Sequence, residues 1–230
     1  MVASLGRSAR DFDQLAEMIA SNGYLVAAPE PRGIGGTERG TNNIDLRDLA
    51  DDVAAVAELY GSPAYVLGHA FGNRVARLTA TRHPTLVAGV MLLGCGGAVL
   101  PEPDDGRALL AVFDRSLDAE RHLEAVRRAF FAPGNDPTAW HDGWHPEVAE
   151  MQGASMAEVP TDEWWRSGDV DVLVVQAAED VIAPPANGIQ LMTDLQGRGE
   201  LVVIEQAGHA MLPEQPARLA EAITDWLARH

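Results

Sequence analysis

The chain contains no lysine, because all 17 of its basic residues are arginines. Enzymes that act through a lysine Schiff base, a lysine-bound pyridoxal cofactor or a P-loop lysine all need that amine. The sequence therefore excludes these three reaction classes. Cysteine is nearly absent too: Cys95 is the single one, so no disulfide can form within the chain.

Net positive charge and long apolar runs are also missing. The formal net charge is −17, from 34 acidic and 17 basic residues, which opposes binding to nucleic acid or to an anionic membrane surface. The longest apolar stretch, 86–100, is short and interrupted by glycines, so it predicts a buried strand and not a membrane span. No signal-peptide pattern is visible at the N-terminus, and we expect a cytoplasmic protein.

The remaining composition is that of a globular protein. The chain has 230 residues and a hydrophobic content of 47%. That length is enough for one domain with a sizeable core, with room for a small inserted cap.

A glycine-framed pentapeptide, GHAFG, occupies residues 68–72. The apolar run 64–67 before it predicts a short buried strand, and residues 71–82 predict a helix that ends before Pro84. A strand, a sharp turn and a helix are the context in which a G-x-S-x-G motif exposes its nucleophile. Here the central residue is Ala70, whose side chain has no nucleophilic atom.

Two further polar residues each follow a predicted strand. Asp180 comes after the apolar run 170–175, and His209 comes after the run 201–204. The chain order of nucleophile position, acid and histidine is typical of one catalytic-triad architecture. Glu179 competes with Asp180 for the acid position, but the spacing of the turn favours Asp180.

Three segments together resemble the α/β-hydrolase superfamily: GHAFG, the turn QAAED ending in Asp180, and EQAGHAMLPEQP around His209. The likeness covers nearly the whole chain. It implies that Ala70 occupies the nucleophile site, Asp180 the acid site and His209 the base site. The sequence departs from the family at Ala177, where the acid turn ordinarily has glycine.

The resemblance also implies an oxyanion hole near the N-terminus. The family's usual His-Gly pair of the oxyanion loop is replaced here by Ala3 and Ser4. Aligned through the residues that follow, the backbone N–H groups of Leu5 and Phe71 would form the hole.

The predicted fold class is α/β: a mainly parallel sheet of about six strands, flanked by helices. Its apolar runs are continuous and not alternating, as is typical of strands buried on both faces. One such run, Tyr24 to Ala28, predicts an early strand. Between 101 and 168 the composition changes to charged helical stretches and tryptophans, which predicts a helical cap inserted between core segments 1–100 and 169–230.

The N-terminal part of the sheet is predicted to be shortened or missing. Members of the superfamily usually have two further strands and a full central third strand here, whereas only Met1 and Val2 precede the oxyanion loop. A missing central strand leaves its neighbours without hydrogen-bond partners. Two consequences are open: marginal stability, or strand pairing in a homodimer.

Four other candidates have plainer interpretations. We expect His69 to be a structural histidine beneath the turn, Cys95 a small buried residue and Arg32 part of a loop. His141 and His145 have the spacing of metal ligands on a helix, but Gly143 and Pro146 disfavour that helix. We therefore expect no metal site, and no cofactor.

The substrate is expected to be a small or medium hydrophobic molecule that carries a carbonyl group, such as an ester or lactone. Tryptophans of the predicted cap could bind it or could simply hold the cap on the core. The three candidates are Trp140, Trp144 and Trp164.

Ala70 leaves three functional hypotheses. First, His209 and Asp180 could act as a general-base dyad on water or on an acidic C–H bond, in a hydrolase or lyase. Second, the chain could be a serine esterase or lactonase inactivated by a serine-to-alanine replacement at position 70. Third, it could be a binding protein without chemistry, although such a protein has no need of both an acid and a base.

Overall fold

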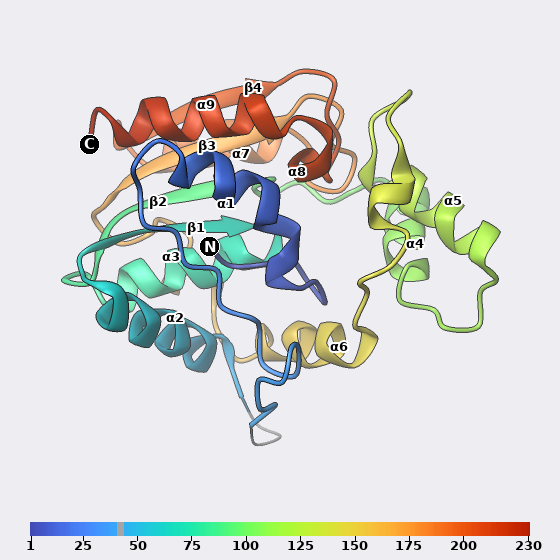
Figure 1. Ribbon diagram of the computed structural model, residues 1–230, viewed down its shortest axis with the longest axis horizontal. Helices are drawn as coiled ribbons and strands as arrows, with labels where there is room; N and C mark the ends of the chain where they lie inside the picture. Colours follow the sequence, from blue (N-terminus) through green and yellow to red (C-terminus); the bar gives the residue numbers. More distant parts are fainter. Residues whose placement is uncertain (41–43) are drawn as a thin grey trace.

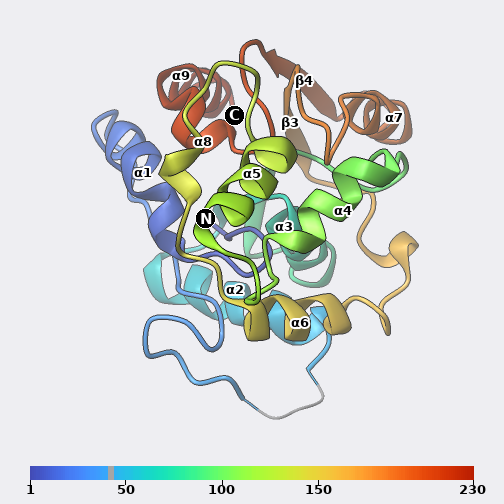
Figure 2. The same ribbon diagram turned by 90° about the vertical axis from the view of Figure 1, so that its right-hand side faces the viewer.

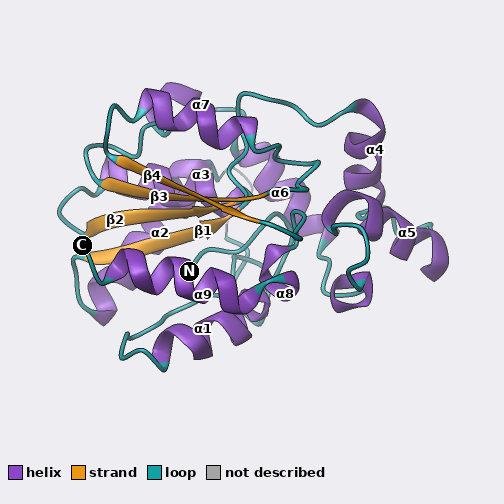
Figure 3. Ribbon diagram, turned by 90° about the horizontal axis from the view of Figure 1, so that it is seen from above, coloured by secondary structure: helices purple, strands orange, loops and turns teal. Residues whose placement is uncertain are grey.

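The structure, a computed structural model, describes residues 1–40 and 44–230. Its centre is a parallel sheet with the order β1-β2-β3-β4, and these strands are Ala64–His69, Val87–Leu93, Asp171–Ala177 and Gly199–Ile204 (Figures 1 and 3). The predicted strands at 64–67, 86–93, 170–175 and 201–204 are confirmed. Because all four are parallel, their carboxyl ends meet at one edge of the sheet, where ligands bind in open α/β sheets.

Helices cover both faces of this sheet. α1 (Asp13–Ala20), which follows the 3-10 helix η1 (Ala9–Phe12), and α9 (Pro216–Leu227) share one cluster of buried side chains with Leu173 and Val175. The alternate residues Val172 and Val174 pack on the other side with α3 (Phe71–Arg82) and α7 (Ala186–Asp194). α2 (Leu46–Tyr60) packs on α3. Burial on both faces explains the continuous apolar runs.

Residues 101–168, which we call the insertion, connect β2 to β3 and contain only helices and loops. Of these, α4 (Pro103–Ala111) and α5 (Ala119–Phe130) lie beyond the carboxyl edge of the sheet and face the viewer in Figure 2. The other helices of the insertion are η2 (Pro137–Trp140), α6 (Pro146–Ser155) and η3 (Thr161–Glu163). The short α8 (Met211–Glu214) follows β4.

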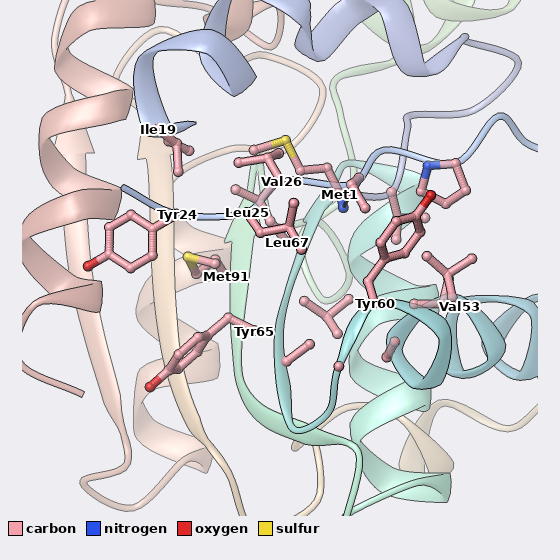
Figure 4. A pocket seen from close by; sticks show the side chains of 18 of the residues that line it. Met1, Ile19, Tyr24, Leu25, Val26, Val53, Tyr60, Tyr65, Leu67 and Met91 are labelled. Carbon is pink, nitrogen blue, oxygen red and sulfur yellow. Dashed lines mark hydrogen bonds between the residues drawn. The ribbon is translucent and has the colours of Figure 1, made fainter. Parts of the chain in front are cut away.

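The prediction of about six strands was wrong for the described residues, which form four strands and an isolated parallel bridge between Val2 and Gly68. The segment 24–28 is not a strand. It has no adjacent strand to pair with: a mostly apolar cavity of about 280 Å³ separates it from β1. Figure 4 shows Tyr24, Val26 and Leu67 around this space. A strand needs a paired neighbour, so apolar sequence alone does not produce one.

None of the helices formed by residues 1–40 and 44–230 combines the length and apolar character needed to cross a membrane.

Candidate active site

The turn between β1 and α3 holds Ala70 in a strained backbone conformation, with φ 51° and ψ −108°. A residue with a Cβ atom adopts positive φ only at a cost, and such strain concentrates at functional sites. The two glycines that frame the turn are sterically required. A Cβ atom on Gly68 would lie 2.2 Å from the carbonyl oxygen of Gly72, and one on Gly72 would lie 2.2 Å from the carbonyl oxygen of Val2. The turn therefore projects residue 70 at the carboxyl edge of the sheet.

Asp180 and His209 meet in a buried hydrogen bond beyond β3 and β4. His209 Nδ1 lies 2.8 Å from Asp180 Oδ2, and the two side chains are almost inaccessible to solvent. The other carboxylate oxygen accepts the N–H groups of Ile182 at 2.9 Å and Ala183 at 2.7 Å. Since an ionised carboxylate only accepts, Nδ1 of His209 donates and its Nε2 is the nitrogen left to act as a base.

One cavity brings the imidazole and the turn together. It has a volume of about 250 Å³, and Ala70 and His209 both line it. Most of its other walls are apolar, and Phe130 places its ring centroid 5.6 Å from that of His209. The remaining lining residues are Ser4, Leu5, Phe71, Arg74, Gly94, Gly96, Gly97, Val99, Leu100, Pro101, Leu109, Phe113, Trp144, Met156, Ile182 and Ala183.

A comparison with known families shows to which family the chain belongs. The family model described as "Alpha/beta hydrolase family" matches residues 2–222, nearly the whole chain. The chain belongs to the alpha/beta hydrolase family. The resemblance inferred from GHAFG, Asp180 and His209 is thus confirmed at the level of family and fold.

Relatives of this alpha/beta hydrolase have several activities. It is 28% identical to a non-heme chloroperoxidase of Streptomyces lividans, over 91% of this chain and 83% of that protein. It is also 28% identical to a 2-hydroxymuconate semialdehyde hydrolase of a Pseudomonas species, over 88% of this chain and 76% of that protein. Among solved structures, an esterase of Thermogutta terrifontis superposes with a TM-score of 0.78 at 22% identity, covering 99% of this chain and 88% of the other. That likeness shows the fold alone.

Leu5 and Phe71 both line this cavity. Within the described residues, neither N–H group has a hydrogen-bond acceptor in the protein. Phe71 is the first residue of α3, where a backbone N–H has no partner within the helix. Two residues that line the cavity with Ala70 therefore each have a backbone N–H group without an acceptor among the described residues.

The tryptophans predicted to bind substrate occupy different places. Trp144 lines the cavity, whereas Trp140 and Trp164 lie outside its lining and are 2% and 5% exposed. Trp140 packs on the rings of Phe130 and His69, and Trp164 packs on α2 and α3. Their indoles join the insertion to the core, the second of the two roles that the sequence allowed.

Glu179 and Asp180, the two acids of the turn after β3, point to different groups. Glu179 accepts the backbone N–H groups of Gln206 at 3.3 Å and Ala207 at 3.1 Å, which belong to the loop that leads to His209. Asp180 instead reaches the imidazole. Glu179 therefore holds the loop, and Asp180 is the acid that touches the histidine.

The other candidates do not line the cavity. Cys95 is fully buried, and burial raises the pKa of its thiol. Arg32 forms a bidentate pair with Asp52, at 2.5 and 2.7 Å, which fixes the loop after the segment 24–28. His141 directly follows η2 and His145 directly precedes α6, so the two do not share a helix. No group of three or more His, Cys, Asp or Glu residues within 1–40 and 44–230 could hold a metal ion.

Three residues near the cavity were not anticipated from the sequence. Phe130 packs beside His209, Arg74 lies in the cavity wall, and Glu214 accepts hydrogen bonds from the loop before the histidine. Glu214 accepts the N–H groups of Gly208 at 2.7 Å and Ala132 at 2.8 Å, and burial raises the pKa of its carboxyl group. A signal for Glu214 was present in its position within the histidine segment EQAGHAMLPEQP, but nothing local indicates the amides that it reaches.

Proposed function

We propose that this chain is an enzyme that acts on a small or medium hydrophobic carbonyl compound of the ester or lactone class. His209 would be its general base, Asp180 would orient that base, and Ala70 would stand at the nucleophile position. The observation that carries the proposal is the buried hydrogen bond of 2.8 Å between His209 and Asp180, at a cavity that Ala70 also lines.

The proposed reaction uses water in place of a serine hydroxyl. Nε2 of His209 removes a proton from a water molecule while the water oxygen bonds to the carbonyl carbon of the substrate. The tetrahedral intermediate places its negative oxygen between the Leu5 and Phe71 amides, the proposed oxyanion hole. When the intermediate collapses, His209 returns the proton to the leaving oxygen, and acid and alcohol are released.

The absence of a nucleophile sets the expected rate. In a serine protease, loss of the serine costs on the order of a millionfold in kcat, yet the remaining site still gives roughly a thousandfold over water. We therefore expect slow turnover by the direct route. The methyl group of Ala70, smaller than a serine side chain, leaves space for the attacking water.

The insertion 101–168 is proposed to be the cap over this site. Trp144, Phe113 and Phe130 come from it and line the cavity. Their apolar surface favours a hydrophobic substrate and limits the entry of water. The 2-hydroxymuconate semialdehyde hydrolase among the relatives supports a carbonyl substrate.

A second candidate function is favoured by one observation. Ala70 keeps φ 51°, the strained conformation that presents a nucleophile in a G-x-S-x-G turn. The pocket could thus be that of a serine esterase or lactonase in which residue 70 has lost its hydroxyl. The Ala70→Ser variant distinguishes the two.

A serine at position 70 should be labelled by a fluorophosphonate probe, detected by mass spectrometry at that residue. If the serine variant gains strong ester hydrolysis while the alanine form turns over no ester or lactone, the second candidate is correct. If the alanine form is active and the serine adds little, the water mechanism stands. A folded serine variant that does not label would refute the proposed oxyanion geometry.

A further inference from the structure

Two arginines on α3, Arg74 and Arg77, lie beside the cavity without a carboxylate partner among the described residues. Arg77 is fully buried, and its guanidinium contacts the carbonyl oxygens of Asn73 and Gly96, each at 3.3 Å. Arg74 is partly buried in the cavity wall against the Met156 sulfur. Both guanidinium groups also lie near the Trp164 ring, at 5.5 Å for Arg74 and 4.8 Å for Arg77.

Buried charges in proteins are ordinarily paired. Arg7, which is buried like Arg77, follows that rule: its guanidinium contacts Asp11 at 2.7 Å. Arg74 and Arg77 have instead only neutral oxygen, sulfur and aromatic neighbours in the part of the chain that the structure describes. The pKa of Arg74 is lowered by burial and by the positive charge of Arg77.

The position of Arg74 in its helix adds to this excess of positive charge. It lies near the start of α3, where no acidic residue is present in the first turn. A helix N-terminus carries a partial positive charge, so a cation there is unfavourable and an anion favourable. A local conflict of this kind, in a chain with 34 acids and 17 arginines, is typical of a functional position.

We propose that Arg74 binds a carboxylate group of the substrate, so that the preferred ligand is a carbonyl compound bearing a second, anionic end. This inference rests on the proposed function, since it places the carbonyl at Ala70 and His209 in the same cavity. The Arg74 guanidinium supplies the hydrogen bonds to the carboxylate. Arg77, three residues later on α3, adds its positive charge without lining the cavity. The apolar walls then hold the chain that connects the two ends of the ligand.

The test is a binding measurement on the protein as it is, with Ala70 in place. Monomethyl esters of succinic, glutaric and adipic acid are titrated by calorimetry against the matched monoamides, in which the carboxylate is replaced by a neutral amide. A charge-assisted hydrogen bond is worth about 1.5–3 kcal/mol, so the best half-ester should bind roughly 10- to 100-fold more tightly than its amide.

Two variants assign the preference to Arg74. Arg74→Gln should remove it, and Arg74→Lys should restore part of it. Arg121→Gln removes the same charge from an arginine whose side chain is 77% exposed on α5, and it should leave the preference unchanged. Circular dichroism and thermal unfolding show that each variant is folded.

Equal binding of half-esters and amides, a preference that survives Arg74→Gln, or no binding of any half-ester at millimolar concentration would each overturn the inference. The proposed function is judged separately, by fluorophosphonate labelling of Ala70→Ser. A variant that labels while the carboxylate has no effect would leave the function intact and refute only the role of Arg74.

Discussion

His69, the residue directly before the strained turn, donates its Nε2 hydrogen to the backbone carbonyl oxygen of His209, at 2.9 Å. The ring is completely buried, and burial together with the charge of His209 lowers the pKa of His69 to about 3. His69 is therefore neutral in the folded protein, as expected of a structural histidine. Its hydrogen bond links β1 to the loop that carries His209.

This buried histidine predicts a specific dependence of stability on pH. In the unfolded chain the pKa of His69 returns to about 6.5, so below that pH the unfolded state binds a proton that the folded state does not. The stabilisation is complete above pH 6.5 and is lost as the pH falls toward 3. Between these values it changes by about 1.4 kcal/mol per pH unit.

Urea unfolding of the wild-type chain and of His69→Gln at pH 6.5, 5.5 and 4.5 measures this effect. Other groups titrate alike in the two proteins, so the difference between their free energies of unfolding isolates His69. We expect the advantage of the wild type over the variant to shrink as the pH falls. A difference independent of pH would show that His69 takes up its proton over the same pH range in the folded and the unfolded states.

A side chain at Gly94 is predicted to displace the His209 imidazole. Gly94 has φ +62°, and a Cβ atom there would lie 3.3 Å from His209 Cε1 and 3.5 Å from Asp180 Oδ2. Gly23 has φ +91° and no atom within 4 Å of such a Cβ, so it is a matched control. Gly94→Ala and Gly23→Ala should each lose about 1–2 kcal/mol of stability, because alanine is strained in the left-handed backbone conformation.

Gly94→Ala alone should also lower kcat, by about tenfold or more, because a shift of about 1 Å at a catalytic group can cost up to about 100-fold. Thermal unfolding measures the loss of stability that both variants share. Ester hydrolysis by each variant in the Ala70→Ser background measures the loss of kcat expected of Gly94→Ala alone. Equal activity of the two variants would mean that the imidazole tolerates displacement.

Glu214 predicts that the loop before His209 contributes to the stability of the fold. It accepts the Gly208 and Ala132 amides through its two carboxylate oxygens, whereas glutamine offers one acceptor oxygen. Glu214→Gln should therefore leave one amide without a partner and cost about 1–3 kcal/mol in the free energy of unfolding. Glu221→Gln, on the exposed side of α9, is the control and should change stability by less than about 0.5 kcal/mol. Chemical denaturation of both variants checks this, and equal stabilities would contradict it.

The parts of the fold that the sequence predicted correctly depend on local patterns. The strand, turn and helix around Ala70 are encoded in consecutive residues, and so is the apolar strand before Asp180. The segment 24–28 has the same apolar character but no neighbour to pair with, so the pattern alone led to a wrong strand. Strand formation depends on a partner elsewhere in the chain.

The surroundings of the site were harder to predict for the same reason. Phe130 and His209 are far apart in the chain and meet because the end of α5 packs against the loop after β4, where the Ala210 N–H donates to the Phe130 carbonyl oxygen at 2.8 Å. Nothing near Arg74 in the sequence shows that it lacks a carboxylate partner, since a missing contact is a property of the folded chain. The same holds for Trp140 and Trp164, whose places in the core depend on packing and not on residue type.

The central claim is that His209, oriented by Asp180, performs chemistry with alanine at position 70. It is tested most directly by the rate at which the unmodified chain hydrolyses a panel of activated esters and lactones, compared with His209→Ala. General-base catalysis contributes about 10²- to 10⁴-fold, so we predict that the variant loses at least about 100-fold of the rate above the uncatalysed reaction. Equal rates for the two proteins, or no turnover of any substrate by the unmodified chain, would contradict the account.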